Sequence, residues 1–161
     1  MEFYQSVGYL LFGTRLRRLS EAFLQDVNRL YRKHKIRFEA SWFPVFYLLS
    51  QQEELSIKEI AGSLHISHSA ASQLVSSLQE KGLVRSVVSR SDARHKVVTF
   101  SPRGHKLLQQ VLPVWKAMQE AMEELSDEAA ASRNLLKALT AVENNIVKKG
   151  VFERIEQKLQ K

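Results

Sequence analysis

The sequence contains no cysteine. Disulfides, thiolate nucleophiles and zinc sites with cysteine ligands are therefore all excluded. The histidines neither have the HExxH spacing of a zinc site nor gather on one predicted element; they are His34, His65, His68, His95 and His105. The sequence thus predicts no metal site and no cofactor.

Long hydrophobic runs are also absent, and none of the apolar stretches is long enough to cross a bilayer. The first 20 residues contain several hydrophobic side chains, but they lack the basic leader and the small-residue cleavage site of a secretory signal. In addition, Gln5 and Ser6 interrupt the apolar stretch. We therefore expect a cytoplasmic protein with no membrane contact.

Acidic residues are scarcer than basic ones, with 17 Asp and Glu against 24 Lys and Arg, and the formal net charge is +7. A positive balance favours a polyanionic partner, such as a nucleic acid or an anionic membrane surface. The basic residues concentrate in the first 38 positions and in residues 83–106, where Asp92 is the only acid. Residues 120–128, by contrast, are acidic.

Proline and glycine are few (3 and 6), and hydrophobic residues make up 44% of the chain, so an ordered, helix-rich protein is expected. Helical periodicity covers about 6–35, 40–52 and 103–158. Pro44 would lie harmlessly in a first helical turn, whereas Pro113 is expected to kink its helix. The first helix carries one apolar stripe, formed by Leu16, Leu19, Phe23, Val27, Leu30 and Tyr31.

The outer helices together have more apolar surface than one small domain can cover. An interface shared between two copies of the chain is the simplest explanation. The division expected from the sequence is a single domain over 1–161, with a DNA-binding lobe at 38–102 and dimerisation helices at 1–37 and 103–161.

Two short helices with good capping residues follow one another in the centre of the chain. Ser56 and Glu59 have the spacing of a capping box, which predicts a helix over 56–64. Ser67 is in turn a suitable N-cap for a second helix over 67–81.

A short β-hairpin is expected directly after these helices. Gly82 ends the second helix as a C-terminal glycine would. Two runs rich in β-branched residues follow, 83–89 and 96–101, and the polar stretch 90–95 joins them as a basic tip. Pro102 is expected to end the hairpin. The fold class predicted is thus mainly α with a small β-hairpin wing, a winged helix-turn-helix flanked by long terminal helices.

In a winged helix-turn-helix, the second helix enters the major groove of DNA. Its outer face here is polar and free of acidic residues, and consists of Ser67, His68, Ser69, Ser72, Gln73, Ser76 and Ser77. Gln73 can form paired hydrogen bonds with an adenine edge, and serine or histidine can reach phosphates or bases. Arg90 and Arg94 at the hairpin tip are candidates for entering a minor groove, and Asp92 would orient one of them through an ion pair.

The stretch 55–104 resembles the core of the MarR family of bacterial transcriptional regulators. The resemblance rests on the EKGLV segment at 80–84, the D-x-R arrangement of Asp92 and Arg94, and the segment from Lys96 through FSPRG at 100–104. It implies a homodimer held by the first and last helices, with two recognition helices reading a pseudo-palindrome. It also implies that Arg94 reaches the minor groove and that Asp92 holds the wing.

Members of this family often respond to small aromatic or phenolic ligands bound between the dimer helices and the DNA-binding lobe. The aromatic residues Phe38, Trp42 and Phe46 are candidates for such an effector pocket, although aromatic residues at helical spacing are more often core. The chain departs from the family where Gln73 replaces a common arginine and where Phe100 and Ser101 replace the usual Leu-Thr.

The function predicted is a sequence-specific regulator that binds double-stranded DNA, acts as a repressor and is released by a small aromatic effector. One alternative is a winged-helix dimer that has lost DNA binding and serves protein interactions, which a neutral or acidic recognition face would favour. The other is an enzyme. His65, His68 and Ser69 near Glu59 are the most tempting catalytic set, but caps and surface polarity explain them. The sequence therefore predicts no enzyme.

Overall fold

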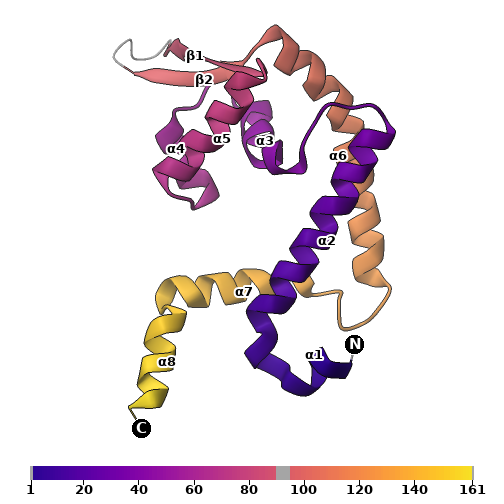
Figure 1. Cartoon of the computed structure of the whole chain (residues 1–161), viewed down its shortest axis with the longest axis vertical. Coiled ribbons are helices and arrows are strands. Elements are labelled where there is room, and N and C mark those ends of the chain that lie inside the picture. The colour runs from indigo at the N-terminus through magenta and orange to yellow at the C-terminus, as the bar shows by residue number, and fades with distance from the viewer. Residues whose placement is uncertain (1, 90–94, 161) are drawn as a thin grey trace. The chain divides into compact units, whose positions relative to one another are not determined.

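A computed structural model describes residues 2–89 and 95–160, and the chain divides into two compact units, residues 1–113 and 114–161 (Figure 1). Helices dominate, and the one sheet in the described ranges is a two-stranded antiparallel hairpin. The predicted fold class, mainly α with a β-hairpin wing, is confirmed. In the described ranges, no helix combines the length and the apolar character that a membrane span requires.

The amino-terminal segment is not one helix from residue 6, as predicted. It consists of α1 (Glu2–Val7), a 3-10 turn (Gly8–Leu11) and α2 (Phe12–Lys33). Gly8 has φ +63°, a left-handed conformation that glycine adopts at little cost, and the α-helix is interrupted there. Of the predicted apolar stripe, only Val27 and Tyr31 are buried within a single chain.

A short loop leads from α2 into the lobe predicted at 38–102. After a 3-10 turn (Ala40–Trp42), α3 spans Phe43–Gln51 and has Pro44 in its first turn, as predicted. The backbone N–H of Ala40 donates to Asn28 Oδ1 on α2 at 2.8 Å. This hydrogen bond ties the start of the lobe to the long helix before it.

The two central helices begin at their predicted caps. In α4 (Ile57–Leu64), the Glu59 N–H donates to Ser56 Oγ at 3.2 Å, and the Ser56 N–H donates to the Glu59 carboxylate at 2.7 Å. In α5 (His68–Glu80), the Ala70 N–H donates to Ser67 Oγ at 3.2 Å. Each cap satisfies backbone donors that have no partner within the helix.

The hairpin consists of β1 (Val84–Val88) and β2 (Lys96–Phe100), with Val84 opposite Phe100 and Val88 opposite Lys96. Leu55, just before α4, adds an isolated antiparallel bridge to Val98, which the sequence did not suggest. Figure 1 shows α5 between α4 and this hairpin.

The core of the lobe contains a chain of aromatic rings in edge-on contact. The ring centroids of Phe38 and Phe46 are 5.0 Å apart, and those of Phe46 and Phe100 are 4.8 Å apart. Tyr31 reaches Phe38 from α2 at 5.0 Å. Edge-to-face packing at these distances is favourable, so the rings join α2, α3 and β2 into one body.

The carboxyl-terminal region is also more divided than the sequence suggested. Helix α6 (Pro102–Asp127) continues through Pro113, and Pro102 is its first residue rather than the end of the hairpin. Residues 128–134 form turns before α7 (Leu135–Lys148) and α8 (Val151–Leu159). The Arg154 guanidinium donates to the carbonyls of Asn145 and Lys149 at 2.8 and 2.9 Å, and thereby caps the end of α7.

Candidate nucleic-acid interface

The turn between α4 and α5 fixes the start of the candidate recognition helix. His65 has φ 52° and ψ 40°, a left-handed conformation, and the Ile66 N–H donates to the Ala61 carbonyl at 3.1 Å. This is the hydrogen bond of a Schellman ending, which closes α4 and redirects the chain within two residues. The following residue, Ser67, caps α5.

The capping box of α4 also affects an ionisable group. Hydrogen bonds from Ser56 lower the pKa of Glu59, because they stabilise its charged carboxylate. The carboxylate is nearly fully exposed and faces its own helix start. Glu59 therefore stabilises the start of α4 and has no catalytic role. This agrees with the interpretation of His65, His68 and Ser69 as structural and surface residues.

One face of α5 is buried and the opposite face is open. Ala71, Val75 and Leu78 are buried against the lobe. The outer face forms an open depression lined by residues of this helix alone: His68, Ser69, Ser72, Gln73, Ser76, Ser77 and Glu80. Six of the seven outer-face residues predicted from the sequence line it, and the seventh, Ser67, is the exposed cap.

Glu80 is the one residue of this surface that the sequence analysis missed. It follows Ser76 by four positions and Gln73 by seven, and this helical spacing could have indicated its place on the same face. Its carboxylate lies at the carboxyl-terminal end of the helix, so the amino-terminal part of the surface is free of acidic groups.

Helix α5 is attached directly to the hairpin. The Gln79 side-chain amide donates to Ser86 Oγ on β1 at 2.8 Å. At the end of α5, Gly82 has φ +67°, and the Leu83 N–H donates to the Leu78 carbonyl at 2.9 Å, a second Schellman ending. The prediction that Gly82 ends this helix is confirmed.

The start of α6 locks the same turn from the other side. Ser101 Oγ donates to the Gly82 carbonyl at 2.6 Å and accepts from the Gly104 N–H at 3.0 Å. The Ser101 N–H donates to the Leu83 carbonyl at 3.0 Å. Helix α5, the hairpin and α6 therefore meet at the turn of Gly82 and Leu83, whose backbone carbonyls accept hydrogen bonds from Ser101.

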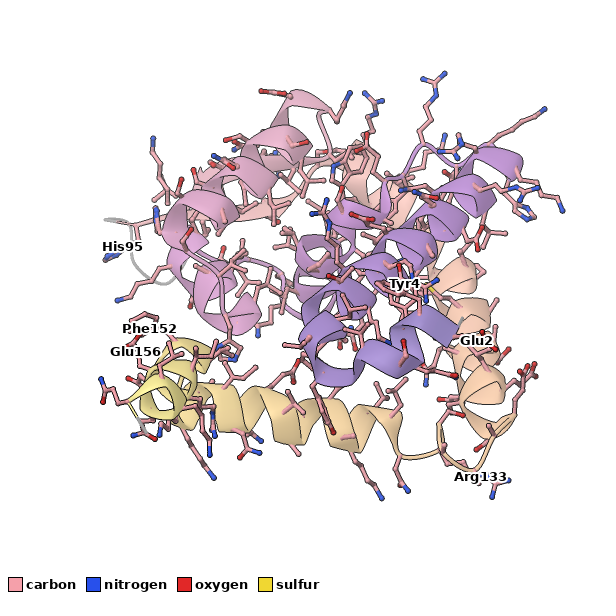
Figure 2. All side chains as sticks on the ribbon, turned by 60° about the horizontal axis from the view of Figure 1, so that its bottom comes forward. Glu2, Tyr4, His95, Arg133, Phe152 and Glu156 are labelled. Atoms are coloured by element: carbon pink, nitrogen blue, oxygen red, sulfur yellow. The ribbon has the colours of Figure 1, made fainter. Side chains whose placement is uncertain are left out.

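The hairpin presents basic groups to solvent along its length. Arg85, exposed on β1, lies near the base, whereas Lys96, exposed on β2, and the exposed His95 lie at the outer end of the hairpin (Figure 2). Arg90, Asp92 and Arg94, the predicted wing residues, lie outside the described residues. Their roles remain predictions.

The candidate effector residues lie in the core of the lobe. Phe38, Trp42 and Phe46 are buried, and the centroid of the Phe38 ring lies 5.8 Å from that of Trp42. They pack against one another as core residues do, and the effector pocket remains a prediction. Among the described residues, no group of His, Asp and Glu side chains is placed to hold a metal ion.

Residues 38–95, which include α4, α5 and β1, match the family model described as the MarR family. This central part of the chain is therefore similar to the MarR family. That this chain is not an enzyme remains a prediction. No protein of curated function matches the chain in sequence.

Solved MarR-family structures share the fold at low sequence identity. MepR from S. aureus, solved as a DNA complex, is 22% identical, with a TM-score of 0.67 over 84% of this chain and 97% of its own. A MarR/EmrR-family regulator from Acinetobacter sp. ADP1 is 18% identical, with a TM-score of 0.67 over 85% and 94%. BpsR from Bordetella bronchiseptica, whose DNA binding is regulated by 6-hydroxynicotinic acid, is 20% identical, with a TM-score of 0.63 over 82% and 91%.

Proposed function

We propose that this chain is a sequence-specific regulator of the MarR family that binds double-stranded DNA through α5 and represses transcription. The observation that carries the proposal is the two-sided character of α5. Its inner face is anchored by buried Ala71, Val75 and Leu78, and its outer face exposes short polar side chains with Gln73 among them. A helix of this kind fits the major groove, where a glutamine can bind an adenine edge through two hydrogen bonds.

The hairpin is proposed to supply a second contact, in the adjacent minor groove. The exposed Arg85 and Lys96 on its strands would provide positive charge for the phosphate backbone. Arg94 is proposed to enter the groove, with Asp92 orienting it. Arg94→Ala is expected to lower operator affinity strongly while the oligomeric state stays unchanged, and unchanged affinity would contradict the wing contact.

The proposal includes a homodimer, because two α5 helices would read a pseudo-palindrome. Its support is apolar surface that one chain leaves open. Tyr9 and Leu10 before α2 are 93% and 90% exposed, and Phe152 on α8, which points away from its helix in Figure 2, is 76% exposed. Among the described residues, neither α7 nor α8 buries any side chain. A monomer rarely leaves this much apolar surface in water.

We also propose that a small aromatic molecule releases the protein from DNA. The support is the behaviour of the related BpsR, whose DNA binding is regulated by 6-hydroxynicotinic acid. Phe38, Trp42 and Phe46 are the residues proposed to contact the effector, which would require the rings to separate. A cytoplasmic location follows from the proposed DNA partner.

Selection of bound duplexes from a random pool tests the proposed function most directly. We expect an enriched pseudo-palindrome whose half-sites are about 10 base pairs apart, or a multiple of this, because two recognition helices would then lie on one face of the duplex. Binding to the selected duplex should weaken steeply with salt. A dimer that enriches no sequence and ignores duplexes in dilute buffer would instead support a protein-interaction module.

A further inference from the structure

Five exposed cations gather where α2 ends and the chain turns into the lobe. They form what we call the basic turn: Arg29, Arg32, Lys33, Lys35 and Arg37. The family match begins only at residue 38, so the basic turn lies outside it.

The local backbone holds these side chains on a defined surface. Arg29, Arg32 and Lys33 have the spacing that places residues on one side of a helix, one turn apart. Lys35 then has φ 56°, and the Ile36 N–H donates to the Tyr31 carbonyl at 2.9 Å. This Schellman ending reverses the chain in the middle of the cluster.

The charge of the basic turn is not compensated by neighbouring acids. In the first half of α2, Arg17 bonds Glu21 at 2.7 Å, and the Arg18 guanidinium lies 4.6 Å from the centre of the Tyr4 ring. No such partner is present for the five cations among residues 2–89 and 95–160. The dipole of α2 accounts for cations in its last turn, such as Arg32 and Lys33, but not for Arg37 beyond it.

The basic turn is also fixed to the body that carries α5. The Asn28–Ala40 hydrogen bond and the Tyr31–Phe38 ring contact bracket it on both sides. Phe38 in turn packs on Phe46, which packs on Phe100 in the hairpin. Positive charge held at a fixed place on a DNA-reading lobe is suited to phosphate, because phosphate contacts set the register and orientation of such a lobe.

We propose that the basic turn binds the sugar–phosphate backbone of the same duplex that α5 reads, a contact that rests on the proposed function. An anionic membrane surface is the less suitable polyanion. Interfacial binding combines cations with exposed apolar side chains, whereas Ile36 is half-buried and Phe38 is buried. The contact adds affinity without sequence preference and makes binding more sensitive to salt.

The test compares the salt dependence of duplex binding by the full chain and by Arg32→Gln/Lys33→Gln/Arg37→Gln. Lys35 is left in place because of its left-handed backbone. If each protomer of a dimer loses one phosphate contact, the slope of log K against log salt becomes less steep by about 2. The ratio of the affinity of the unaltered chain to that of the variant is then about a hundredfold larger at 0.1 M salt than at 1 M salt. The loss should be equal on selected and random duplexes.

The matched control removes three exposed lysines from the second unit, as Lys137→Gln/Lys148→Gln/Lys158→Gln. It changes the net charge equally, so any general electrostatic effect appears in both variants. Circular dichroism checks that each variant is folded. Arg29→Gln/Arg37→Gln, which leaves the cations of the last helical turn in place, replaces the triple variant if that one unfolds.

The outcomes separate the two proposals. If the unaltered chain binds duplexes and the variant shows the slope of the control, the basic turn does not contact phosphate, and the proposed function stands. If the unaltered chain ignores duplexes, the proposed function fails and the basic-turn contact fails with it. A third outcome is that the unaltered chain and the control bind phosphatidylserine vesicles but the variant does not, while the salt slope of duplex binding is unchanged in the variant. This outcome would assign the basic turn to a membrane and overturn the proposal.

Discussion

A Cβ atom built on Gly104 would lie 2.0 Å from the carbonyl oxygen of Leu83. The first turn of α6 therefore packs directly on the backbone that links α5 to β1, at a separation that only glycine permits. The Leu83 carbonyl cannot withdraw easily, because it accepts a hydrogen bond from the Ser101 N–H at 3.0 Å. This contact holds the recognition helix and the base of the hairpin against α6.

Gly104→Ala is accordingly expected to destabilise the protein by about 1–3 kcal/mol, the usual cost of forcing extra volume into a packed site. Urea unfolding at fixed protein concentration measures the change. Gly62→Ala is the matched control, because nothing lies within 4 Å of a Cβ at this exposed position of α4. The control should be neutral or slightly stabilising, since alanine is the better helix former. Equal unfolding midpoints for the two variants would contradict the role of this contact.

The left-handed backbone of His65 gives a prediction of the opposite sign. At φ 52°, a residue with a Cβ has a steric strain energy that glycine avoids. Glycine loses more conformational entropy on folding, which offsets part of this advantage. We expect His65→Gly to raise the free energy of unfolding by about 0.5–1 kcal/mol. Ser63→Gly, two residues earlier within α4, should lower it. A loss of stability in His65→Gly would show that the imidazole makes a contact that matters more than the backbone strain.

The capping box of α4 predicts a dependence on pH. The pKa of Glu59 is lower in the folded chain than in the unfolded one, so its contribution is complete above the unfolded pKa of about 4.3. It is lost as the pH falls through the folded pKa. Glu59→Ala should therefore destabilise the protein at pH 7 and have little effect near pH 2.

Chemical unfolding at both pH values measures this difference. Glu143→Ala, which removes an exposed carboxylate from α7, controls for the loss of one negative charge. Equal destabilisation by Glu59→Ala at both pH values would mean that the side chain acts through packing rather than through its charged hydrogen bond.

Gln73→Ala tests the recognition surface itself. We expect the discrimination between the selected duplex and a random one to fall by about 1–3 kcal/mol, because an adenine edge loses its paired hydrogen bonds. The salt slope should remain unchanged, since no phosphate contact is removed. Fluorescence anisotropy titrations on both duplexes measure these quantities. Gln109→Ala, on an exposed part of α6, should change neither, and unchanged discrimination in Gln73→Ala would exclude this residue from base recognition.

The sequence predicted the centre of the chain well because capping residues act locally. Ser56, Ser67 and Gly82 each determine one helix end through hydrogen bonds within a few residues, and all three do so in the structure. The polar outer face of α5 followed from helical spacing in the same way.

The rest depends on interactions that periodicity does not reveal. The break at Gly8 interrupts an apolar pattern that continues on both sides of it. The turn at 128–134 follows α6 despite the alanines that favour a helix, and there Ser132 Oγ donates to the Ser126 carbonyl at 2.8 Å. Helix α6 continues through Pro113, where the expected kink stays a prediction. The bridge between Leu55 and Val98 joins residues distant in sequence.

The short side chains of α5 set how closely this protein must approach its proposed target. Serine reaches little beyond the Cβ of its helix, and the exposed face of α5 carries no lysine or arginine that could bridge a gap. An α-helix with its side chains nearly fills the width of a major groove, so hydroxyl groups meet base edges only when the helix is seated at full depth. Small errors in tilt would then break several contacts together. The rigid turn at Gly82 and Gly104 keeps the helix at one angle, and selectivity would come from steric fit rather than from long, adaptable cations.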